Sequence, residues 1–97
     1  MATLVVAACA LADIERLLQE LRATAPGTAG RAASALRTAL AALTDHPLAG
    51  SRLDGDIRVL AIACGTIGAV AAYRYVIPDD EIRVLAVRAQ RELGIAP

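Results

Sequence analysis

The stretch from Ile57 to Arg91 constrains the fold more than any other part of the sequence. Its three apolar, β-branched runs are Ile57 to Ala63, Ala69 to Ile77 and Ile82 to Val87, separated by the turn signals Gly65-Thr66-Ile67-Gly68 and Pro78-Asp79-Asp80. Valine and isoleucine suit a pleated surface, whereas glycine, proline and aspartate supply the dihedral angles that reverse a chain. The stretch therefore predicts an antiparallel meander of three strands.

Before the meander, the sequence predicts one strand and two amphipathic helices. Thr3 to Ala7 is a short β-branched run. From about Ala8 the apolar residues follow a helical period, at Leu11, Ile14, Leu17, Leu18 and Leu21. Pro26-Gly27 ends this helix, and Thr28 is expected to cap the next one. The apolar stripe of the second helix is Ala32, Ala33, Leu36, Ala39, Leu40 and Leu43.

The predicted order is strand, helix, helix, strand, strand, strand, in one domain over residues 1–97. Ser51 to Asp56 is expected to be a polar loop that leads into the meander. The fold class is α+β, β-α-α-β-β-β, with a helical hairpin packed on one face of a small, mostly antiparallel sheet. Because no helix remains for the other face, we expect that face to be polar or covered by another chain.

The amino-acid composition excludes some functions and makes others less favoured. Ten arginines balance ten acidic residues, lysine does not occur, and the formal net charge is zero. A neutral domain has no overall field that attracts nucleic acid, so RNA or DNA binding would need a local arginine patch. A lysine base or Schiff-base nucleophile is excluded. With 23 alanines and two aromatic residues the core is thin, which favours dependence on a partner.

The sequence offers no arrangement of metal ligands. Cys9 and Cys64 fit no metal spacing and are expected to be buried, inert thiols in a reducing cytosol. His46 is the only histidine, and as a loop residue next to a helix end it is expected to be structural. We therefore expect no metal and no cofactor.

Two uncharged segments imitate membrane signals only superficially. Met1 to Ala12 contains no lysine or arginine, whereas a secretory signal peptide carries such a residue before its apolar segment. The fifteen residues from Val59 to Tyr73 fall short of the ~20 that cross a bilayer. We expect a soluble, cytoplasmic protein without a membrane partner.

Four short stretches, in this order, carry a family resemblance. They are Ala10, Ala12, Asp13 and Ile14; Pro47-x-x-Gly50 followed by Gly55 and Arg58; Tyr73-Arg74-Tyr75; and Val84 to Glu92. They resemble the A-x-A-D-L helix opening, the L-x-x-x-P-x-x-G segment before an R-x-L strand, the Y-R-Y/V strand and the closing I-L-A-I-R-H-Q-R-E of RelE/ParE toxins. These toxins belong to bacterial type II toxin–antitoxin modules, and the resemblance covers nearly the whole chain.

Three positions depart from the family pattern. Ala7 stands where the family usually has a serine or threonine cap, and Ala89 stands where a histidine is common. The hairpin between Tyr75 and Ile82 matches the family's length only if Tyr75, rather than Tyr73, takes the conserved tyrosine position.

The resemblance implies one of two activities. RelE-like members cleave mRNA in the ribosome, whereas ParE-like members of plasmid-stabilising modules poison DNA gyrase. RNA cleavage at a ribose 2′-OH needs a base and an acid. A ribonuclease here would use Arg58, Tyr75 and Arg88, but arginine stays protonated and makes a poor base. A ParE-like inhibitor without catalysis is favoured; a ribosome-dependent endonuclease and a non-toxic, antitoxin-binding homologue remain alternatives.

The candidate contacts with an antitoxin or target are Arg58, Arg74, Tyr75, Arg88 and Arg91. Arg83 is expected to pair with the acidic turn Asp79-Asp80-Glu81, and in a regular strand it would point away from the face of Arg88. We expect a cognate antitoxin to lay an amphipathic helix or an added strand on the open face. The arginines would then hold its carboxylates, giving a hetero-oligomer.

Overall fold

The computed structural model describes residues 1–64 and 67–93 and has the predicted α+β architecture with one additional strand. Its elements are β1 (Thr3–Val6), α1 (Ala8–Thr24), α2 (Pro26–Ala42), β2 (Ser51–Asp54), β3 (Ile57–Cys64), β4 (Ile67–Val76), the 3-10 turn η1 (Ile77–Asp79), β5 (Glu81–Ala89) and the 3-10 turn η2 (Gln90–Leu93). Gly65 and Thr66 of the first predicted turn, and the tail after Leu93, lie outside the described residues.

The five strands form one mixed sheet in the order β1-β5-β4-β3-β2. β1 runs parallel to β5, and the other neighbouring strands are antiparallel, as the predicted meander requires. The predicted loop at Ser51 to Asp56 is wrong, because Ser51–Asp54 pairs with β3 as an edge strand. All four residues of β2 are exposed, so no alternation of apolar and polar side chains marks the strand in the sequence.

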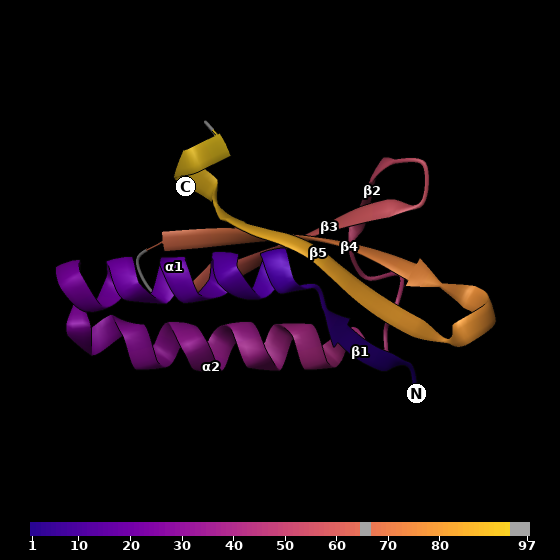
Figure 1. Ribbon diagram of the computed structural model, residues 1–97, viewed down its shortest axis with the longest axis horizontal. Helices are drawn as coiled ribbons and strands as arrows, with labels where there is room; N and C mark the ends of the chain where they lie inside the picture. Colours follow the sequence, from indigo (N-terminus) through magenta and orange to yellow (C-terminus); the bar gives the residue numbers. More distant parts are fainter. Residues whose placement is uncertain (65–66, 94–97) are drawn as a thin grey trace.

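Both helices lie on the same side of the sheet, beneath it in Figure 1. Only Ala25 separates them, and Pro26 is the first residue of α2, where a missing N–H costs nothing. The predicted cap is therefore wrong, because Thr28 lies inside the helix. In the described ranges, neither helix is long and apolar enough to cross a membrane.

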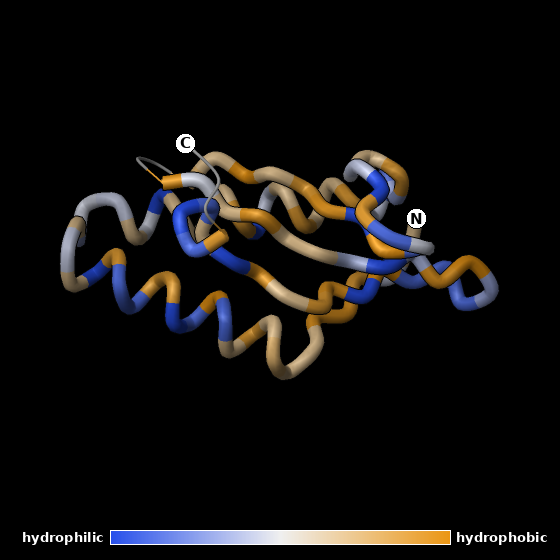
Figure 2. Tube along the Cα trace, turned by 90° about the horizontal axis from the view of Figure 1, so that it is seen from above, coloured by the Kyte–Doolittle hydropathy of each residue, from blue (hydrophilic) through white to orange (hydrophobic). Residues whose placement is uncertain are grey.

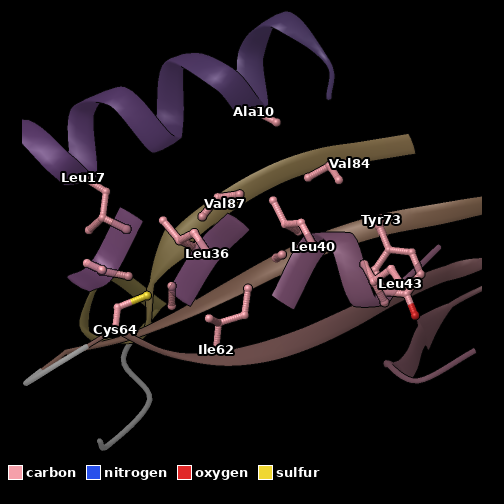
Figure 3. Packing of buried hydrophobic residues seen from close by; sticks show 14 of the residues in the cluster. Ala10, Leu17, Leu36, Leu40, Leu43, Ile62, Cys64, Tyr73, Val84 and Val87 are labelled. Carbon is pink, nitrogen blue, oxygen red and sulfur yellow. The ribbon is translucent and has the colours of Figure 1, made fainter. Parts of the chain in front are cut away.

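The core fills the space between this helical hairpin and the sheet. Leu36 and Leu40 of α2 lie toward Val87 and Val84 of β5, while Leu43, directly after α2, lies beside Tyr73; all of these side chains are buried (Figure 3). Each such side chain contributes roughly 1.5–3 kcal/mol to stability. The core therefore contains residues from both the N-terminal and the C-terminal half of the chain.

Two residues expected to be buried are exposed. Leu11 is 50% exposed, because Ala10 and Asp13 take the inward positions of the first turns of α1. Cys9 also faces solvent, whereas Cys64 is buried, and burial raises the pKa of its thiol. The prediction of two buried cysteines is thus half wrong, although both are free thiols.

The face of the sheet opposite the helices, called the open face below, carries small apolar side chains. By the alternation of β3 and β4 these include Val59, Ala61, Ala63, Val70 and Ala72. Figure 2, a view from above, shows mostly apolar colours along the strands. η2 covers one corner of this face, where the Gln90 side chain lies against Gly68. The helices therefore cover one face only, as predicted.

Candidate functional site

Tyr73 anchors the loop of residues 47–50, called the anchored loop. It is the largest fully buried side chain among the described residues. Its O–H donates to the Pro47 carbonyl at 2.9 Å and accepts the Gly50 N–H at 2.8 Å. A Cβ on Gly50 would lie 2.7 Å from both the Tyr73 ring and the Val59 carbonyl oxygen. Contacts with Tyr73 therefore fix the conformation of the Pro47-x-x-Gly50 segment.

Arg58 holds the same loop from β3. Its Nη1 donates to the Gly50 carbonyl at 2.8 Å and to the Leu48 carbonyl at 3.4 Å. Arg58 also lies directly opposite Tyr73 in the β3–β4 pair, so the two side chains share the helix-side face of the sheet. This predicted binding residue thus has a structural role as well.

Tyr75 has a different environment from Tyr73. Its hydroxyl donates to Asp80 Oδ1 at 2.8 Å. This hydrogen bond raises the pKa of Tyr75, and desolvation and the charge of Asp80 act in the same direction. A tyrosine with a raised pKa is a poorer general base at neutral pH. Tyr73 is the buried anchor, so Tyr75 is the tyrosine that a partner can reach.

Asp13 joins α1 to β5 at the edge of the sheet. The residue is only 6% exposed, its Oδ2 accepts the Val87 N–H at 3.0 Å, and Arg88 forms an ion pair with it. Burial would raise the pKa of Asp13, but the Val87 hydrogen bond, Arg88 and the more distant Arg16 outweigh burial and lower it. Arg88 is therefore held by a buried carboxylate.

A more exposed set of ion pairs continues along α1. Arg91 Nη2 lies 3.3 Å from Glu20 Oε2, and Arg16 Nη2 lies 3.7 Å from Glu92 Oε2. The Arg91 and Glu20 side chains are 63% and 42% exposed, and pairs of this kind contribute little to stability. A partner can therefore compete for Arg91 at little cost.

A β-bulge changes the face to which Arg88 points. Tyr73 pairs with Val84 but Ala72 pairs with Ala86, so the register skips Leu85. Arg83 lies opposite Arg74, and Arg88 lies opposite Val70. The partners Val70 and Arg74 are four residues apart on β4, which is regular between them, so both point to the open face. Arg83 and Arg88 therefore extend from the open face as well. The expectation of opposite faces, made for a regular strand, is wrong.

Carboxylates neutralise the cross-strand pair of Arg74 and Arg83. Asp56 Oδ1 lies 3.0 Å from Arg74 Nε, and Asp79 Oδ2 lies 3.7 Å from Arg83 Nη2. Glu81 also pairs with Arg83, which confirms the predicted contact with the acidic turn. Glu81 and Asp79 both raise the pKa of this arginine further, Glu81 by the larger amount.

The β2–β3 and β4–β5 turns border an open pocket of about 180 Å³, called the arginine pocket. It is lined by Leu48, Arg52, Gly55, Asp56, Arg58, Tyr75 and Ile77. Among the described residues, no group of three or more histidines, cysteines or carboxylates could hold a metal ion.

The predicted contact residues thus fall into three places. Arg58 and Tyr75 lie at the arginine pocket, Arg74 and Arg88 start from the open face, and Arg91 lies beside α1, where Arg88 also reaches Asp13. Sequence reasoning missed Arg52 as a pocket residue and Asp13 as a partner of Arg88. Asp13 had a visible signal, because a carboxylate at an inward position of a helix needs a partner.

The comparisons agree with this fold. A family model described as ParE toxin of type II toxin-antitoxin system, parDE, matches residues 4–94. A search of curated proteins gave no match. The match takes in both helices and the sheet described above. The chain therefore belongs to the ParE toxin family of type II toxin–antitoxin systems.

Proposed function

We propose that this toxin inhibits DNA gyrase by protein–protein contact, without catalysis of its own, and that a cognate antitoxin neutralises it. The observation that carries the proposal is the separation of Arg88 from Arg58 and Tyr75, the other two residues that a ribonuclease mechanism would use. Catalytic acids and bases must lie within hydrogen-bond reach of one reacting group. Residues that stay apart favour contact over RNA cleavage.

Two features of the geometry keep Arg88 from acting with Arg58 and Tyr75. Arg58 lies opposite Tyr73 on the helix-side face, whereas Arg88 lies opposite Val70 on the open face. Val70 and Tyr73 are three residues apart on β4, about 10 Å along the strand. Arg88 is also bound to Asp13, and the Tyr75 hydroxyl is bound to Asp80. Arg58 and Tyr75 share the arginine pocket, but Arg88 lies away from both, so the three residues cannot act together on one phosphate.

Induction in cells separates the candidate functions. We expect DNA-damage signalling with intact mRNA, and loss of supercoiling activity when purified toxin is added to purified gyrase. Cleaved mRNA on stalled ribosomes would contradict the proposal and select the RelE-like endonuclease. Harmless expression in the absence of antitoxin would select the homologue that only binds an antitoxin.

The open face supports antitoxin binding there. Its centre is apolar and carries no helix, while Arg74 and Arg88 flank it. Ala61→Glu places a charge on this face and should abolish antitoxin capture in a pull-down with the product of the neighbouring open reading frame. Ala41→Glu, at an exposed position near the end of α2, is the matched control and should retain capture. Loss of capture in both variants would count against the open face.

A further inference from the structure

The arginine pocket contains two like charges in direct cross-strand register. Arg52 of β2 lies opposite Arg58 of β3. Side chains in such positions are neighbours, and like charges there are destabilising. Arg52 donates to the Gly55 carbonyl at 2.9 Å, and Arg58 donates to carbonyls of the anchored loop. Within the part of the chain that the structure describes, no carboxylate forms an ion pair with either arginine.

The other cross-strand arginine pair shows the contrast. Arg74 and Arg83 also lie directly opposite one another, but Asp56, Asp79 and Glu81 neutralise them. Among residues 1–64 and 67–93, carboxylates pair with one of these two arginine pairs and not with the other. An anion from outside the chain would remove the repulsion between Arg52 and Arg58.

We propose that the arginine pocket binds an acidic side chain on an extended segment of the antitoxin. Guanidinium groups hold a carboxylate with paired, charge-assisted hydrogen bonds. Leu48 and Ile77, which are 62% and 73% exposed at the pocket, receive an apolar neighbour of that side chain. β2 is the outer strand of the sheet, so its free edge accepts an added strand. The inference rests on the proposed function only in naming the antitoxin as the partner.

The surroundings of the pocket favour a peptide over a nucleic acid. Asp56 lines the pocket, where its carboxylate pairs with Arg74, the same hairpin carries Asp54, and Asp80 lies beside Tyr75. These carboxylates repel a chain of phosphates, whose binding depends on several cations together. The exposed apolar side chains at the pocket have no counterpart in a phosphate backbone. A single carboxylate next to an apolar residue fits both the charge and the lining.

A peptide titration followed by NMR tests the proposal. The probe is acetyl-Leu-Glu-Leu-Glu-amide, added to isotope-labelled protein while the arginine Nε–H signals are recorded. We expect shifts at Arg52 and Arg58 and about tenfold weaker binding in Arg52→Gln, since one charge-assisted contact is lost. Arg37→Gln, at an exposed position of α2, is the matched control and should bind fully. Arg58 is not varied, because it holds the anchored loop.

The remaining outcomes are decisive as well. Acetyl-Leu-Gln-Leu-Gln-amide should bind at least about tenfold more weakly, and equal binding would overturn carboxylate recognition. Stronger binding of a short oligothymidylate at the same arginines would overturn the peptide in favour of a nucleic acid. Unchanged arginine signals with the acidic peptide would overturn the site. The assay contains no gyrase and no cells, so its failure is distinct from failure of the proposed function.

Discussion

Gly50→Ala should lower the free energy of unfolding by about 3 kcal/mol. The added Cβ would lie 2.7 Å from the Val59 carbonyl oxygen and from Tyr73 Cε1. The carbonyl belongs to the backbone of β3, and the ring is fully buried, so neither can move without disturbing the sheet or the core. The clash therefore displaces the anchored loop, and its two hydrogen bonds to Tyr73 weaken with it.

Urea denaturation measures this loss against a glycine with free space around it. A Cβ on Gly30 of α2 meets nothing within 4 Å, so Gly30→Ala should raise the free energy of unfolding by about 0.5–1 kcal/mol. Tyr73→Phe removes the anchoring hydroxyl and should cost about 2 kcal/mol, because two backbone groups lose their partner. If Gly50→Ala proves no less stable than the wild type, the anchor is not what fixes this loop.

The fold was predictable where the spacing of apolar residues in the sequence shows which side of a helix or strand is buried. The three strands of the meander and both helices have a buried and an exposed side, and that contrast is visible in the sequence. β2 was missed because every one of its side chains is exposed. The predicted end of the first helix before Pro26 is confirmed, but the predicted cap at Thr28 failed because Pro26 also takes the first position of α2 and leaves Thr28 inside the helix.

The site was less predictable, because its contacts join distant parts of the chain. Arginines and tyrosines carry many of the polar contacts around the sheet, and their role toward a partner stays a prediction. Their partners were not visible, because Asp13 meets Arg88 and Pro47 meets Tyr73 only after the sheet forms. The bulge at Leu85, which reverses the face of Arg88, also has no signature in an apolar run.

Arg88→Gln and Arg91→Gln should separate the two predicted contact arginines by their effect on stability. Arg88→Gln leaves the buried Asp13 carboxylate without its ion-pair partner and should cost about 2 kcal/mol at pH 7. The estimate is moderate because the Arg88 side chain is 41% exposed and Val87 N–H still binds the carboxylate. Arg91→Gln breaks only an exposed pair and should cost less than about 0.5 kcal/mol. Urea denaturation at pH 7 compares them.

The pH dependence of stability identifies Asp13 as the source of the Arg88 effect. The folded chain lowers the pKa of Asp13, so the unfolded chain binds this proton at higher pH than the folded chain does. The stabilisation is therefore full above the ordinary value of about 3.9 and is lost as pH falls through the lower folded pKa. Arg88→Gln removes one cause of the lowered pKa, so its deficit should shrink as pH falls below about 4. A deficit that stayed constant from pH 7 to pH 3 would mean that Arg88 stabilises the fold through packing, not through the charge of Asp13.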